Sequence, residues 1–378
     1  MSTKREEKVE TFPLWKLPAL ARRLVFQQMD KRDLMDLSMT SRPVKKFLTA
    51  YKPHAVQLTW LFDGSYATTA RRSKYAEGHV YQYLTVTLTF GNDEESEEED
   101  EEDEEEEEKA EKVENFNFYI LRDPSVKRDY VRTINGVKAP LAMRKRKNPK
   151  EFEIAGGKER VVDLKFMEDL TQHFKSIFYI DIYNVTLRAI REFDFFGSFF
   201  WKYSGKKFGK FCTFNKNVKF NEEQMKMICN ELEVDYLRLS VVTDCELIHG
   251  LNLNSKVLKI WNTGYLTIED VLESKCEKIE IIFPEGLNVD LHLIKTVTYW
   301  KTGKKLKNLK RLNLETGTFN SETRDEEQNS FFEKARSLGI RRHEWDEKKC
   351  YINRDTDNTV ALLEFDGWEF NMAVQEKR

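Results

Sequence analysis

The chain has 378 residues, of which 40% are hydrophobic and 34% are charged, and its formal net charge is −3. This length and composition allow two or three folded domains, and no stretch approaches the roughly 18 consecutive apolar residues that a membrane-spanning helix needs. The five cysteines are widely spaced and residues 1–10 carry no apolar signal region, so we expect reduced core thiols in a cytoplasmic or nuclear protein.

Residues 12–51 predict three short helices in succession. The first begins at Pro18, because proline fits an opening helical turn. The second begins at Asp33, and Ser41 can cap the third. Their apolar residues recur at helical spacing, but so short a segment cannot bury them unaided. The surface that covers them is either the rest of this chain or a separate protein.

The same segment resembles an F-box. The matching residues are Leu17-Pro18, Leu24-Val25, Met29, Asp33-Leu34, Leu37-Ser38, Ser41 and Phe47-Leu48, and Phe12-Pro13-Leu14 is similar to the entry of the F-box group known mainly from nematodes. Pro43-Val44 departs from the family, which often has Trp here after Cys, Lys or Arg. In that family the module packs on a Skp-type adaptor, which a cullin holds. The resemblance therefore implies an adaptor-binding surface made of Phe12, Leu14, Leu17, Pro18, Leu20, Leu24, Val25, Met29, Leu34 and Leu37.

The next segment, 56–160, is predicted to be rich in strands and to carry an acidic loop. Residues 81–90 and 115–121 alternate apolar and polar side chains and predict two paired strands. Between them, 93–108 hold fifteen of the 65 acidic residues, which leaves 50 acidic against 62 basic residues in the rest of the chain. Such a tract repels itself and is expected to be disordered. It is either a tolerated solvated insertion or a binder of basic partners.

A basic cluster, 144–147, follows a predicted strand at 129–137. It is either a polar loop drawn to the acidic tract or a nuclear import signal. No basic face with interleaved aromatic residues accompanies it, so we expect no nucleic-acid partner.

The body of the chain, 161–320, predicts helices and strands in alternation. Helices are expected at 166–174, 221–232, 267–274 and 291–300, and strands at 177–182, 236–239, 257–260, 278–281 and 309–314. Leu237, Leu258 and Ile279 follow one another at 21-residue steps, a period within the leucine-rich-repeat range. We predict an irregular leucine-rich-repeat-like array, and the alternative is an α/β sheet with coincidental spacing.

This body also resembles the F-box-associated type-2 domain that accompanies the nematode-type F-box. The matching residues are Leu237-Arg238-Leu239, Leu258-Lys259-Ile260-Trp261, Trp300-Lys301-Thr302-Gly303 and Leu309-Lys310-Arg311-Leu312, which cover roughly 220–320. The resemblance implies that this region holds a target protein. It assigns no individual contact residue.

Two further segments complete the predicted fold. The aromatic run 193–201 is either a packed segment or part of a target-binding surface. The C-terminal region, 321–378, is expected to hold a helix and a β-hairpin of 359–365 and 368–374 around Asp366-Gly367, with a third strand at 350–354.

No catalytic motif emerges from the residues. The six histidines are scattered, no G-x-S-x-G occurs, and the glycines around 205–210 are too close for a phosphate loop. We therefore predict a non-catalytic protein without metal or cofactor. Its fold class is α+β, with an F-box at 12–55, the strand-rich segment, the repeat-like body and the C-terminal region. The predicted function is a substrate-recognition adaptor of a Skp–cullin–F-box ubiquitin ligase, and the alternatives are a non-degradative F-box scaffold or an acidic-loop chaperone for basic proteins.

Overall fold

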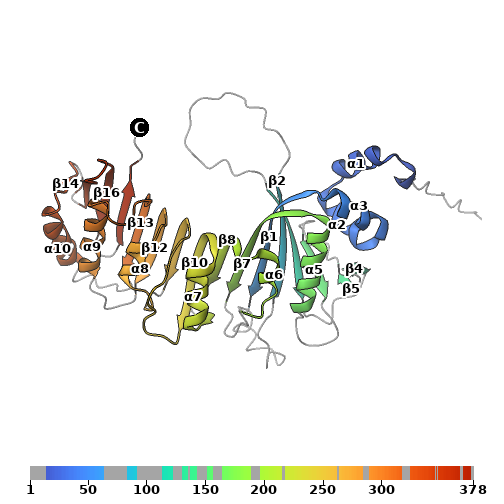
Figure 1. Ribbon diagram of the computed structural model, residues 1–378, viewed down its shortest axis with the longest axis horizontal. Coiled ribbons are helices and arrows are strands. Elements are labelled where there is room, and N and C mark those ends of the chain that lie inside the picture. The colour runs from blue at the N-terminus through green and yellow to red at the C-terminus, as the bar shows by residue number, and fades with distance from the viewer. Residues whose placement is uncertain are drawn as a thin grey trace, which may run out of the picture.

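The computed structural model shows a mixed α+β fold, built on one large sheet with helices (Figure 1). It describes residues 14–63, 83–91, 113–121, 130–134, 137–142, 151–155, 164–188, 196–214, 218–261, 264–283, 289–316, 324–344, 346, 348–366 and 369–375. The α-helices are α1 (Ala19–Gln28), α2 (Lys31–Thr40), α3 (Arg42–Tyr51), α5 (Leu164–Ile177), α6 (Phe200–Ser204), α7 (Glu222–Glu231), α8 (Ile268–Glu273), α9 (Val289–Lys301) and α10 (Arg324–Arg336). The strands are β1 (His54–Asp63), β2 (Tyr83–Gly91), β3 (Val113–Leu121), β4 (Tyr130–Ile134), β5 (Val137–Ala142), β6 (Glu151–Ala155), β7 (Tyr179–Arg188), β8 (Lys207–Phe214), β9 (Val218–Phe220), β10 (Glu233–Thr243), β11 (Val257–Trp261), β12 (Lys278–Phe283), β13 (Arg311–Thr316), β14 (Arg341–Arg342), β15 (Lys349–Asn353), β16 (Val360–Phe365) and β17 (Glu369–Val374).

The centre of the sheet is a run of parallel strands in the order β1, β7, β8, β10, β11, β12 and β13. Leu237 of β10 lies beside Leu258 of β11, which lies beside Ile279 of β12 and then Leu312 of β13. The 21-residue spacing in the sequence therefore corresponds to lateral neighbours in the sheet. The longer step to Leu312 accommodates α9 as a crossover helix.

Antiparallel strands extend both ends of this run. β2 and β3 pair beside β1, and β17, β16, β15 and β14 follow β13. The predicted pairing around the acidic tract is confirmed, since Gly91 lies opposite Val113, although residues 93–108 themselves lie outside the described residues. The C-terminal hairpin and its third strand are also confirmed. Because β1 pairs with β7 and β13 with β17, the sheet continues across the expected boundaries at 160 and 320.

The strand predicted at 129–137 is confirmed for 130–134 but is too long, because β4 ends at Ile134 and pairs with β5 in an antiparallel hairpin, with Ile134 opposite Val137. The intervening residues are Asn135-Gly136, and Asn-Gly is the strongest short-range hairpin signal. The basic cluster 144–147 lies outside the described residues.

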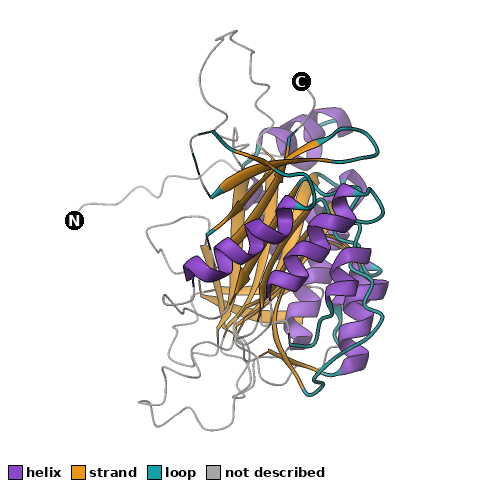
Figure 2. Cartoon of the chain, turned by 90° about the vertical axis from the view of Figure 1, so that its left-hand side faces the viewer, coloured by secondary structure: helices purple, strands orange, loops and turns teal. Residues whose placement is uncertain are grey.

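The helices that follow α3 gather on one side of the sheet (Figure 2). Alternate strand residues point toward them, so Leu237 and Leu239 are buried while Arg238 between them is only half-buried on the opposite face. α7 begins as predicted, because the Asn221 side chain accepts a hydrogen bond from the Gln224 amide in a capping box. Among the described residues, no helix covers the other face of the parallel run.

Within the aromatic run 193–201, residues 199–201 pack against this core, whereas Phe196 is 46% exposed. Phe200 is fully buried, Phe199 meets Trp60 edge-on with ring centroids 5.9 Å apart, and Trp201 is half-buried. Residues 193–195 lie outside the described residues. The packed alternative is therefore favoured for 199–201.

The three N-terminal helices form a small cluster beside α5, at one end of the sheet (Figure 1). Ser41 caps α3 as predicted, since its hydroxyl accepts from the Val44 amide. α2 begins two residues earlier than predicted, at Lys31, because Asp30 caps it through the Arg32 amide. The cluster packs on α5 through α3 and on β4 through α2.

Candidate docking groove between the first and third helices

Helix α1 turns most of its apolar surface outward. Its only buried residue is Phe26, whereas Leu20 and Leu24 have exposed fractions of 70% and 54%. These two leucines are four residues apart and therefore lie on one helical face. Trp15, just before the helix, is 42% exposed. Exposed apolar side chains are common singly, but three gathered on one small helical cluster form a candidate interaction surface.

The floor of this surface is rigid. The rings of Phe26 and Phe47 stack with centroids 4.7 Å apart, and Trp15 lies tilted against Phe26 at 6.4 Å. The guanidinium of Arg22 lies over both Trp15 and Phe47, at 5.6 and 5.9 Å from the ring centroids. Aromatic and cation–π contacts of this kind fix the relative positions of α1 and α3.

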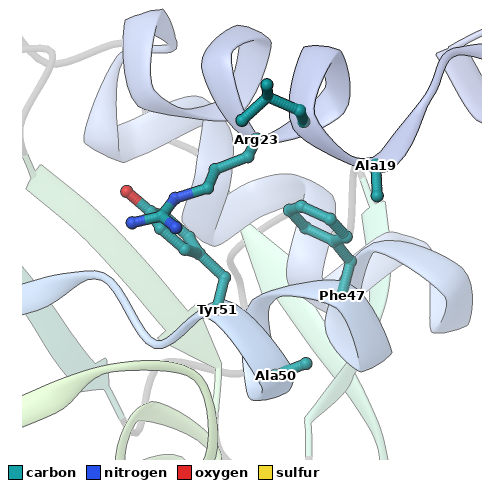
Figure 3. Close-up of a pocket in the computed structure, with 6 residues that line it drawn as sticks. Ala19, Arg23, Phe47, Ala50 and Tyr51 are labelled. Carbon is teal, nitrogen blue, oxygen red and sulfur yellow. The ribbon is translucent and has the colours of Figure 1, made fainter.

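An open groove of about 420 Å³ runs between these two helices. Figure 3 shows it with Arg23 reaching over the ring of Tyr51, 5.0 Å from the centroid, and Phe47 facing the space between the helices. The residues that line it are Ala19, Leu20, Arg23, Phe47, Ala50 and Tyr51. Small alanines, an exposed leucine and two aromatic side chains line a space that can accept an apolar partner residue.

The predicted adaptor-binding residues divide by exposure. Leu20, Leu24 and Pro18 are exposed, whereas Leu34 is only 1% exposed and belongs to the interior. The half-buried remainder is Leu14, Leu17, Val25, Met29 and Leu37. Phe12 lies outside the described residues.

The predicted adaptor-binding surface did not include Trp15, Ala19, Arg23, Phe47, Ala50 or Tyr51. The stripe of α3 was visible in the spacing of its apolar residues. The sequence did not indicate that this stripe faces α1 across an open groove.

The cluster is joined to the body by a buried polar contact. Ser38 of α2 lies 2.9 Å from Nε2 of His173 on α5, and its hydroxyl also donates to the Met35 carbonyl. Both side chains are buried. Desolvation, aided by the nearby Lys45 charge, lowers the pKa of His173 to about 3. At neutral pH this histidine is uncharged and acts as a fixed hydrogen-bonding joint.

A second hollow, near the N-terminal ends of β7, β8 and β10, is polar instead. Its carboxylates are paired: Glu233 with Lys207 at 2.9 Å, and Asp235 with Lys256 at 2.9 Å. Paired surface charges of this kind indicate a solvated edge.

The described residues contain no group of histidine, cysteine or carboxylate side chains placed to hold a metal ion. All five cysteines are free thiols, and burial raises the pKa of Cys229 and Cys350 to about 12. Within the described part of the chain, no helix has the length and apolar character to cross a membrane. No family model, curated protein or solved structure matches this chain.

Proposed function

We propose that this chain is the substrate-recognition adaptor of a Skp–cullin–F-box ubiquitin ligase. The single observation that carries the proposal is the outward-facing leucine surface of α1, with Leu20 and Leu24 exposed beside the groove to α3. It occurs in the segment whose residues resemble an F-box. Leaving two leucines and a tryptophan in water is unfavourable, and a docked adaptor would relieve this.

The joint between cluster and body supports the same function. An adaptor of this kind acts by proximity, because it holds a target near the ubiquitin carrier and raises the local concentration of the target's lysines. The Ser38–His173 contact and the packing of α3 on α5 fix the cluster against the sheet. A fixed spacing between the docking end and the target-binding end favours transfer to particular lysines.

We interpret the parallel run from β10 to β13 as an irregular leucine-rich-repeat-like body. The lateral register of Leu237, Leu258 and Ile279 supports this interpretation, as does the placement of α8 and α9 after β11 and β12. Its role in the proposal is to hold the target protein.

The test is direct binding to a purified Skp-type adaptor. Leu20→Asp and Leu24→Asp each replace an apolar contact by a charge, and each should weaken binding by roughly 10- to 150-fold, since a buried leucine contributes about 1.5–3 kcal/mol. The matched control is Leu247→Asp, because Leu247 is 45% exposed but lies after β10, away from the groove.

Unchanged affinity in the Leu20→Asp, Leu24→Asp double variant, with the fold intact by circular dichroism, would overturn the docking assignment. A scaffold that binds the adaptor without driving ubiquitin transfer would pass this binding test. The half-life of a co-purified target after depletion of the chain separates the two functions.

A further inference from the structure

The open face of the sheet carries a row of alternating cationic and aromatic side chains. Arg188 of β7 lies over the ring of Phe214 of β8 at 5.4 Å from the centroid. Arg238 of β10 lies between that ring and Trp261 of β11, at 4.2 and 4.1 Å. Four neighbouring strands therefore contribute one member each, and the guanidinium plane of Arg238 is held on both sides.

Arg238 has no anionic partner among the described residues. Arg188, by contrast, shares its charge with Asp63, whose carboxylate lies 3.7 Å away. Arg238 is half-buried between its two rings, and its Nε has no hydrogen-bond partner in the described structure. A guanidinium held in place without an acceptor is prepared for one, because little side-chain entropy remains to be lost on binding.

An unpaired carboxylate lies on the same face, three strands away. Glu315 of β13 is exposed and makes no ion pair with any described residue. Its pKa is raised, first by desolvation and then by the charges of Glu369 and Glu280. Lys259 and Glu280, which lie between, neutralise each other in an ion pair.

Part of the open face has its polar groups paired with one another. On β1, β2, β3 and β7 the polar side chains bond to one another: Asn184 donates to Gln57 at 2.9 Å, and Thr89 donates to Asn115 at 2.7 Å. These side chains form a network of hydrogen bonds among themselves. Arg238 and Glu315 lie outside this paired region, on β10 and β13.

The register gives the separation of the two charges. Arg238 shares a row with Lys259, Glu280 and Asn313, and Glu315 lies two residues beyond Asn313 on β13. With strands about 4.8 Å apart and about 3.3 Å per residue, the two positions are roughly 16 Å apart. An extended peptide covers about 14 Å in four residues, and its residues i and i+4 point to the same side.

We propose that the face between β10 and β13 docks an extended peptide of a partner protein, which places an acidic side chain on Arg238 and a basic side chain four residues away on Glu315. Trp261 and Ile282 lie between these positions and offer an apolar contact to the intervening residue. The composition suits an interface, since Trp and Arg dominate binding hot spots. That the partner is a ligase target depends on the function proposed above. The peptide-docking proposal itself depends on residues of the sheet face, which are different from those of the groove.

A carboxylate fits this site better than a phosphate. Of the two arginines in the aromatic row, only Arg238 lacks an anion among the described residues, since the neighbouring Arg188 is already paired. A single unpaired cation matches a single negative charge, whereas a phosphate group carries nearly two. Asp and Glu side chains can accept two parallel bonds from such a planar fork.

The experiment is selection from an immobilised positional-scanning library of short capped peptides, with Asp, Glu, Gln, Lys and phosphoserine pools. The full chain should retain Asp or Glu pools about tenfold or more above the matched Gln pools, with Lys or Arg favoured four positions away. Arg238→Met keeps an apolar stem between the two rings and should abolish the acidic preference. Glu315→Gln should abolish only the basic preference.

Arg311→Gln is the matched control, because Arg311 is an exposed arginine of β13 that faces the same side as Glu315. It should leave the selection unchanged. Acidic preference that survives in Arg238→Met, a phosphoserine preference above Glu, or no preference at all would each overturn the proposal. Adaptor binding should be unaffected in Arg238→Met, and peptide selection should be unaffected in Leu20→Asp, so the two proposals can fail separately.

Discussion

The α1–α3 groove and the open face of the sheet expose different chemistry for different reasons. At and beside the groove, the exposed groups are the leucines Leu20 and Leu24, with Leu20 at 70% exposure. On the sheet face, the distinguishing group is a half-buried charge held in place by aromatic rings, as Arg238 is between Phe214 and Trp261. An apolar surface gains binding free energy from any partner whose shape excludes water from it. A fixed, unpaired charge instead discriminates among partners.

This difference matches two tasks. A constant partner needs affinity, which burial of leucine supplies, and a selected partner needs specificity, which placed charges supply. The Ser38–His173 contact joins the two regions, so a change at the joint tests whether they act as one body.

The largest effect is expected beneath the groove, at Phe26. Its ring is fully buried and stacks on Phe47, so Phe26→Ala leaves a cavity and should lower the free energy of unfolding by about 3–5 kcal/mol. Leu20→Ala, at the exposed rim, should change it by no more than about 0.5 kcal/mol. Urea unfolding of both variants checks this. Equal losses of unfolding free energy would show that the rim and the floor of the groove do not differ as described.

Much of the fold could be predicted from local patterns, because local physics decides them. Pro18 and Ser41 mark where helices begin, and the spacing of Leu237 and Leu258 anticipated neighbouring parallel strands. The hairpin of β4 and β5 was missed although Asn135-Gly136 signals it.

The candidate sites were harder to predict because they depend on distant contacts. Periodicity places Leu20 and Leu34 alike on apolar stripes. Which stripe stays open depends on where α5 packs, through a contact between residues 135 positions apart. The row that holds Arg238 likewise assembles from four strands, so no local sequence pattern contains it.

The next effect is a pH dependence at the joint. The pKa of His173 is about 3 in the folded chain and near 6.5 when exposed. The folded state therefore binds fewer protons below pH 6.5, so the stabilisation is complete above that pH and is lost as pH falls toward 3. Protonation linked to His173 alone should lower the unfolding free energy by about 2 kcal/mol when the pH falls from 7 to 5.

Urea unfolding of His173→Gln at the same two pH values isolates this contribution, because glutamine can still hydrogen-bond Ser38 but does not titrate. The variant should lose about 2 kcal/mol less than the parent chain between those pH values. His249→Gln, at an exposed histidine, serves as the control and should retain the parent slope. A parent-like slope in His173→Gln would show that the joint is not the titrating element.

The smallest effect compares the two arginines that lie over aromatic rings, one in each region. Arg238 is held between two rings at 4.1 and 4.2 Å, whereas the exposed Arg23 lies over Tyr51 alone at 5.0 Å. Because cation–π attraction grows as the cation is desolvated, Arg238→Met should lower the unfolding free energy by about 1–2 kcal/mol and Arg23→Met by less than about 1 kcal/mol. Thermal and urea unfolding of the two variants side by side measure the difference. If Arg23→Met is the more destabilising variant, the Arg23 guanidinium in the groove is bound at least as strongly as that of Arg238 on the sheet. The contrast between an apolar docking surface and an ordered charged one would then be wrong.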